Sequence, residues 1–98
     1  MTTFNTILRG ASFRPMEAQA AVLNLIPGKE LLLVREPENV HDNNAIMVVT
    51  HDEIHIGFVA AEHAATLAPL MDEGLQFICT VDAGAGEVKK SILDHNSS

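Results

Sequence analysis

The spacing of apolar positions along the chain predicts six short strands and two helices. Apolar runs of strand length are separated by turn-forming residues, and two stretches rich in Ala carry apolar residues at helical spacing. The predicted strands span residues 4–13, 29–35, 45–50, 54–59, 75–82 and 87–93. The predicted helices span residues 16–26 and 60–72. Pro15 suits the start of the first helix, because a proline at that position loses no hydrogen bond.

Local composition predicts finer features of these elements. The single glycine of the first strand, Gly10, is expected to bend it. The continuous apolar run 29–35 is typical of a strand covered on both faces. Pro69 is expected to kink or shorten the second helix, and the glycine-rich segment 83–86 predicts a hairpin turn. In the strand 54–59 the alternation predicts one fully apolar face, formed by Ile54, Ile56 and Phe58.

The element order, β-α-β-β-β-α-β-β, favours a mainly β fold with two short helices, of the α+β class. Strands this short close best into a compact six-stranded OB-like or SH3-like barrel, which also leaves no exposed sheet edge. A chain of 98 residues suits one domain. We expect residues 1–93 to form that domain and residues 94–98 to be a short flexible tail.

Charge is distributed unevenly along the chain. The formal net charge of −7 argues against a basic protein that coats nucleic acid. Residues 1–35 carry four Lys and Arg against two Glu, whereas residues 36–88 carry ten carboxylates and no Lys or Arg. An anionic ligand would therefore have to approach the strands formed by the first and last segments of the chain.

The remaining composition favours a soluble cytoplasmic protein that uses no metal or cofactor. The single cysteine, Cys79, excludes an internal disulfide, and we expect it to be a buried small apolar side chain. No apolar run reaches the roughly 20 residues of a membrane span, and the N-terminus lacks the features of a signal peptide. The histidines lack metal-ligand spacing and no nucleophile–base pair is visible, so we predict neither a metal site nor an enzyme.

Residues 35–48, with the sequence REPENVHDNNAIMV, resemble the signature of the HIRAN domain family, Arg-(Glu/Asp)-Pro-x-Asn-Pro-(Tyr/His)-Asp-x-Asn-Ala-(Ile/Val). The segments 10–14 (GASFR) and 56–59 (IGFV) resemble two further family elements. The resemblance covers roughly residues 5–92 and implies a small OB-like barrel with two helices. Members of this family occur fused to helicase-like ATPases and nucleases, and also as free-standing bacterial or phage proteins. We expect a member of the free-standing kind.

The resemblance implies a non-catalytic module that binds single-stranded DNA at a free 3′-OH end, in DNA repair or replication or in phage–host DNA processing. Asp42 matches the family acidic residue that receives the 3′-hydroxyl, and a carboxylate accepts a hydrogen bond from a hydroxyl but repels a phosphate. His41 and Phe13 match the positions of rings that stack on bases. Arg14 is expected to contact a phosphate, and Asn39 a phosphate or a base.

Each of these five side chains also has a structural interpretation, which the sequence leaves open. Asp42 and Asn39 are typical of residues that hold their own turns. His41 suits an exposed loop, and Phe13 suits a core position in an apolar strand. Arg14 suits a solvated position beside the start of a helix.

Other signature positions are expected to serve the fold. Arg35 is expected to hydrogen-bond the loop carbonyls or Glu36. The other predicted fold determinants are Asn44, Ala45 and Gly57.

The chain departs from the DNA-binding relative of the family at several positions. Val40 replaces the usual proline, and residues that hold the DNA backbone in that relative are replaced here by Ser12, Ala60 and Ala61. Each lost phosphate contact weakens binding, so we expect a weak affinity limited to a few terminal nucleotides. The acidic segment also supports an alternative function, a protein-interaction or DNA-mimic module that binds a basic, DNA-handling partner.

Overall fold

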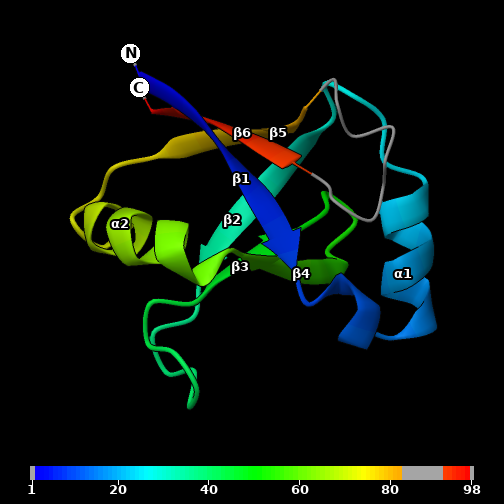
Figure 1. Cartoon of the computed structure of the whole chain (residues 1–98), viewed down its shortest axis with the longest axis horizontal. Coiled ribbons are helices and arrows are strands. Elements are labelled where there is room, and N and C mark those ends of the chain that lie inside the picture. Colours follow the sequence, from blue (N-terminus) through cyan, green and yellow to red (C-terminus); the bar gives the residue numbers. More distant parts are fainter. Residues whose placement is uncertain (1, 83–91, 98) are drawn as a thin grey trace.

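The structure, a computed structural model, describes residues 2–82 and 92–97. It is mainly β with two α-helices, as predicted (Figure 1). The strands are β1 (Thr2–Arg9), β2 (Glu30–Arg35), β3 (Ile46–Val49), β4 (His55–Val59), β5 (Phe77–Val81) and β6 (Ile92–Ser97). The helices are the short 3-10 helix η1 (Ala11–Phe13), α1 (Met16–Leu23) and α2 (Ala61–Asp72).

The strands form a closed barrel in the order β1-β4-β3-β2-β5-β6, with every neighbouring pair antiparallel. In Figure 1, α1 and α2 lie on opposite sides of this barrel, and the long β2–β3 connection projects from it as a loop. The largest fully buried side chains are Ile46, Ile56, Leu67, Val48, Val81, Thr6 and Cys79. The burial of Cys79 confirms its predicted place in the core.

The second helix is attached closely to β1. Its first turn begins after Ala60, whose N–H donates to the carbonyl of Ile7 over 3.2 Å. One turn into the helix, the His63 ring forms a hydrogen bond with the Thr6 hydroxyl. Buried Ala64 and Leu67 add apolar contact with the core, so the start of α2 has a fixed position beside β1 and β4.

The first strand is shorter than predicted. It ends at Arg9, and residues 11–13 form η1 instead of continuing the strand. Gly10 has a φ of 75°, in the left-handed region that side-chain-bearing residues avoid. The glycine therefore ends the strand and turns the chain into η1, where we had expected it only to bend the strand.

The predicted coverage of β2 on both faces is wrong. Leu31 is buried, but Leu32 and Val34 are each 39% exposed, because only one face of this barrel strand points into the core. The predicted single apolar face of β4 is also wrong. Val48 pairs with Gly57 and Val49 pairs with His55, so Ile56 of β4 is left without a partner in β3. This bulge shifts which residues of β4 point inward and which point outward. Ile56 and Val59 are consequently buried, whereas Phe58 stays partly exposed.

The ends of several elements also differ from the predictions. Helix α1 ends at Leu23 rather than at residue 26, and α2 runs past Pro69 to Asp72 without being shortened. The final strand lies at Ile92–Ser97, so the predicted flexible tail is wrong for residues 94–97. These residues pair with both β1 and β5, and this double pairing fixes a segment whose sequence has little apolar character. The predicted hairpin at 83–86 lies outside the described residues.

Candidate nucleic-acid interface

The projecting loop between β2 and β3 is held at its base by Arg35. Its Nη1 donates to the carbonyl of Ala45 over 2.7 Å, and its Nη2 donates to the carbonyl of Asn43 over 2.9 Å. The same guanidinium binds both carboxylate oxygens of Asp72 at the end of α2, at 2.9 and 3.1 Å. This hydrogen bonding holds the pKa of Asp72 below its ordinary value. The expected structural role of Arg35 is confirmed, and the residue links β2, the loop and α2.

Within the loop, two side chains replace regular backbone hydrogen bonds. The amide oxygen of Asn39 accepts from the backbone N–H groups of His41 and Asp42, at 2.8 and 3.1 Å. The Oδ1 atom of Asp42 accepts from the N–H of Asn44 at 2.8 Å. These turns confirm the structural interpretation of both residues. The other oxygen of Asp42 accepts no hydrogen bond from the residues that the structure describes, and the side chain is only partly buried.

The loop forms one wall of a groove that is open to solvent, which we call the loop groove. Its volume is about 680 Å³. Its lining comes from the loop, the end of β1, β4 and the first turn of α2. The lining residues are Arg9, Asn39, His41, Asp42, Ala45, Phe58, Val59, Ala60, Ala61 and Glu62. Three of the five predicted site residues, Asn39, His41 and Asp42, therefore meet in one place.

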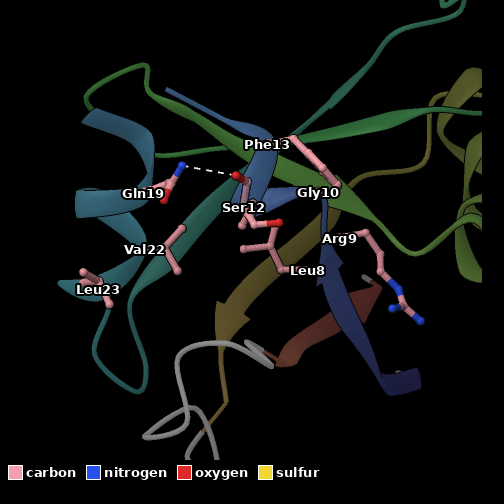
Figure 2. Close-up of a pocket in the computed structure, with 9 residues that line it drawn as sticks. Leu8, Arg9, Gly10, Ser12, Phe13, Gln19, Val22 and Leu23 are labelled. Carbon is pink, nitrogen blue, oxygen red and sulfur yellow. Dashed lines mark hydrogen bonds between the residues drawn. The ribbon is translucent and has the colours of Figure 1, made fainter. Parts of the chain in front are cut away.

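A second groove of about 690 Å³ lies between the end of β1, η1 and α1, and we call it the η1 groove. Figure 2 shows Val22 and Leu23 of α1 on one side of it and Arg9 on the other. The predicted site residue Phe13 lines this groove and is 91% exposed, so its interpretation as a core residue is wrong. A phenyl ring this exposed is available for contact with a ligand.

Arg14 lies outside the lining of both grooves. Its Nε donates to the carbonyl of His55 over 2.9 Å, so the side chain is attached to β4. Burial of the His55 ring, reinforced by the nearby positive charge of Arg14, lowers the pKa of that histidine. The His55 ring contacts Phe58 edge-on with centroids 4.8 Å apart, so His55 supports a ring that lines the loop groove.

The sequence analysis missed two residues of the loop groove, Arg9 and Phe58. They stand directly opposite each other in the antiparallel β1–β4 pair, and such partners project from the same face of a sheet. The alternation had assigned Phe58 to the apolar interior, and only the β4 bulge turns it outward. No signal in the sequence pairs residue 9 with residue 58.

Comparisons with known proteins place the chain in a family. The HIRAN domain family matches residues 2–95, nearly the whole chain. The chain belongs to the HIRAN domain family. Its solved structural relatives include the HIRAN domain of human HLTF, with a TM-score of 0.79 and 23% identity over 97% of this chain and 74% of that one. The NMR structure of the HLTF HIRAN domain in its DNA-bound conformation has a TM-score of 0.69 and 22% identity, over 97% and 73% of the two chains.

Other relatives of this HIRAN domain come from bacteria and plants. A Lactobacillus plantarum protein has a TM-score of 0.83 and 25% identity over 96% of this chain and 93% of its own. The Fanconi-associated nuclease 1 homolog of Arabidopsis thaliana is 33% identical over 73 residues, which cover 74% of this chain and 8% of the plant protein. An Arabidopsis SWI/SNF-related matrix-associated actin-dependent regulator of chromatin, subfamily A member 3-like 1, is 48% identical over 48 residues, covering 48% and 5%. This HIRAN domain thus corresponds to less than a tenth of either plant protein.

The described part of this HIRAN domain offers little other chemistry. Among residues 5–82, whose side chains the structure describes, no group of three or more His, Cys, Asp and Glu side chains is placed to hold a metal ion. No helix in the same residues has the length and apolar character needed to cross a membrane. The two grooves are therefore the features on which a function can be argued.

Proposed function

We propose that this HIRAN domain is a non-catalytic module that binds single-stranded DNA and recognises its 3′-OH end, in DNA repair or replication or in phage–host DNA processing. The observation that carries the proposal is the meeting of His41 and Asp42 with Arg9 and Phe58 in one solvent-open groove. This places a carboxylate, two rings and a cation around a space large enough for a nucleotide. The DNA-bound conformation of the related HLTF HIRAN domain supports the same ligand class.

Asp42 is the residue that distinguishes an end from a continuous strand. One of its oxygens is used by the loop turn, and the second is available to accept a hydrogen bond from a terminal 3′-hydroxyl. A 3′-phosphate would bring negative charge against the same carboxylate and against Glu62 in the groove lining. The domain should therefore prefer a 3′-OH end over a 3′-phosphate end.

The rings provide contacts that do not depend on base identity. His41 is exposed on the loop and Phe13 is exposed in the η1 groove, and base stacking on an aromatic ring contributes about 1–3 kcal/mol per base. Imidazole offers a smaller face than phenol or indole, so His41 should contribute at the lower end of that range. Asn39 acts mainly by shaping the loop that carries His41 and Asp42.

The first turn of α2 completes the wall of the loop groove. Ala61 and Glu62 of this turn line the groove opposite the residues of the β2–β3 loop. We propose that a six-stranded OB-like barrel serves as the rigid support for this turn and for the loop.

Fluorescence anisotropy with two oligonucleotides tests the proposal. Wild-type protein should bind a short single strand with a 3′-OH end more tightly than the same strand with a 3′-phosphate. The matched variant is Asp42→Asn, which keeps an amide oxygen for the Asn44 N–H but removes the charge. A hydrogen bond to a charged group contributes about 1.5–3 kcal/mol, so this variant should lose about tenfold or more in affinity for the 3′-OH strand.

Equal affinity of the wild-type protein for both ends would overturn recognition of the 3′-OH. Failure to bind either strand at low salt would overturn DNA binding altogether. In that case the acidic protein-interaction or DNA-mimic function, with a basic DNA-handling partner, becomes the better explanation of the charge distribution.

A further inference from the structure

We propose that the loop groove and the η1 groove hold two consecutive nucleotides, and that Arg9 binds the phosphate that links them. This inference rests on the proposed function, because it assumes that the terminal nucleotide occupies the loop groove. It adds a second subsite, a direction for the strand and a phosphate-binding residue that the family signature does not contain.

The two grooves adjoin at the end of β1. Arg9 is the residue common to the lining of both. Its neighbour Gly10 lines the η1 groove, and a Cβ atom added to Gly10 would lie 3.8 Å from the Phe58 ring in the loop groove. No side chain therefore separates Phe58 from Gly10, and a strand can pass from one groove to the other over the glycine.

Arg9 has the orientation that this passage requires. Figure 2 shows its side chain leaving β1 with the guanidinium directed away from Val22 and Leu23 of α1. Its direct cross-strand partner is Phe58, so the guanidinium and this ring project from the same face of the sheet. A base against Phe58 would thus have its phosphate within reach of Arg9.

Of the three arginines, Arg9 is the one whose guanidinium remains available. Arg35 is bound by two loop carbonyls and Asp72, and Arg14 is bound by the carbonyl of His55. The guanidinium of Arg9 forms no hydrogen bond or ion pair with residues 5–82, whose side chains the structure describes, and the Arg9 side chain is exposed. Among the described residues that line the grooves, Arg9 is the only Lys or Arg.

The charges around Arg9 determine where along the strand the phosphate lies. Asp42 and Glu62 make the interior of the loop groove unfavourable for a phosphate but suitable for a sugar hydroxyl. Arg9 stands at the junction with the η1 groove, whose other lining residues carry no formal charge. A guanidinium binds two phosphate oxygens at once, so the linkage between the terminal and penultimate nucleotides is placed there.

The penultimate base then lies in the η1 groove. Leu8, Val22 and Leu23 provide an apolar wall, and the exposed Phe13 ring provides a stacking surface. Gln19 is fixed at the rim, since its amide group donates to the carbonyls of Arg14 and Ser12 at 2.7 and 3.2 Å. This arrangement accepts a base through its faces and selects weakly among bases.

The test is a thermodynamic cycle between the protein and a single DNA linkage. Arg9→Gln and the wild-type protein are titrated with 3′-OH oligonucleotides that carry one uncharged methylphosphonate, at either the last linkage or one near the 5′ end. For the wild-type protein, neutralising the last linkage should weaken binding about tenfold, as expected for a lost charged hydrogen bond. Arg9→Gln should show the same loss with unmodified DNA and no further loss with the modified last linkage.

Lys29→Gln is the matched control, because Lys29 is exposed, lines neither groove and carries the same charge. It should bind like the wild-type protein and remain sensitive to the modified last linkage. Arg9→Lys, which keeps the charge but not the fork of donors, should lose less affinity than Arg9→Gln. Circular dichroism melting of each variant verifies folding.

Wild-type protein that binds the 3′-OH strand but tolerates the modified last linkage would overturn this inference and leave the proposed function standing. The inference would also be overturned if the methylphosphonate weakened binding of the Arg9→Gln variant equally at the last linkage and near the 5′ end. Failure of the wild-type protein to bind any oligonucleotide would instead overturn the proposed function itself.

Discussion

Asp42 has two roles that belong to its two oxygen atoms. Its Oδ1 atom holds the turn by accepting from the Asn44 N–H, so the carboxylate has a fixed direction before any ligand arrives. The sequence left a turn role and a hydroxyl-binding role open for this residue. The turn role is confirmed by the geometry, and the hydroxyl-binding role stays a prediction that the turn makes easier, because a preorganised acceptor loses little entropy on binding.

Gly57 is required because two strands approach closely. A Cβ atom at this position would lie 2.6 Å from the carbonyl oxygen of Arg9 and 2.8 Å from the Leu8 side chain. We expect Gly57→Ala to lower the free energy of unfolding by about 3 kcal/mol, at the upper end for overpacking, because a backbone atom cannot move aside. Urea denaturation measures this loss.

Gly28→Ala serves as the control for Gly57→Ala. Gly28 has a φ of 88° and nothing within 4 Å of an added Cβ, so it tests backbone strain without a steric clash. The expected loss there is about 1 kcal/mol. Equal losses for the two variants would contradict the close-approach explanation.

His55 should make stability depend on pH. Burial lowers the pKa of His55 from its ordinary value of 6.5, so the unfolded chain takes up this proton at a higher pH than the folded protein does. Its contribution to stability is therefore complete above pH 6.5 and is lost as the pH falls below that value toward the lower folded pKa. Urea midpoints at pH 7.5 and 5.5 should differ more for the wild-type protein than for His55→Gln.

The comparison of the wild-type protein with His55→Gln separates the effect of this residue from that of the other four histidines, which are present in both proteins. A pH dependence that is unchanged in the variant would show that the lowered pKa of His55 does not contribute to stability.

At the scale of elements, the β2–β3 loop behaves as an extension of the barrel rather than as a flexible connection. Arg35 joins it to the end of α2, and two backbone hydrogen bonds, Glu36 N–H to Ala45 and Ala45 N–H to Asp42, close it from within. A loop with this many internal partners can present side chains at fixed positions.

Replacing Arg35 should loosen the loop without removing any groove residue. Arg35→Lys keeps the charge but cannot reproduce the four donor contacts, and we expect a loss of about 2 kcal/mol in the free energy of unfolding. Amide hydrogen exchange in residues 36–45 should accelerate, and affinity for a 3′-OH strand should fall with it.

The control is Asp72→Asn, which leaves the bonds from Arg35 to the loop carbonyls intact. Amide hydrogen exchange in residues 36–45 should change little in this variant. The variant should lower the free energy of unfolding only above the pH where Asp72 ionises, since the pKa of this carboxyl is held below its ordinary value. Equal loop exchange in the two variants would contradict the role assigned to Arg35.

The sequence predicted the type and order of the elements better than their ends. Periodicity located both helices, because it depends only on residues a few positions apart. Strand Ile92–Ser97 has little apolar pattern and exists through its pairing with β1 and β5, which local sequence does not encode. The outward turn of Phe58 likewise depends on a bulge against β3.

The residues of the candidate site likewise divide into those that the sequence places together and those that only the fold brings to them. Asn39, His41 and Asp42 are neighbours in one motif, so the sequence alone placed them together. Arg9 joins them only through the β1–β4 pairing, across about fifty residues of chain, and Phe13 is exposed only because η1 carries it away from the core.

At the scale of the whole molecule, the charge distribution limits how the domain can bind DNA. The net charge is −7, and residues 36–88 contain no Lys or Arg, yet the grooves lie where Arg9 from the basic N-terminal segment meets the loop. Residues 36–88 offer no Lys or Arg to the phosphates of a strand that continues beyond the grooves, so a longer strand would gain little. Binding should therefore be confined to the end of the strand and should not increase with its length.

Salt dependence measures this confinement. For single strands the slope of log affinity against log salt is about −0.7 for each phosphate neutralised, so one contact at Arg9 predicts only a two- to threefold loss of affinity between about 50 and 200 mM salt. A domain that bound six to ten phosphates would lose about 10³–10⁵-fold over the same range on duplex DNA. Anisotropy titrations with linear strands of increasing length, and with a circular strand of the same sequence, should give one shallow slope for every linear strand and no binding to the circle. A steep slope, or affinity for the circle equal to that for linear DNA, would mean that the strand is held along its backbone and that Asp42 does not sense its end.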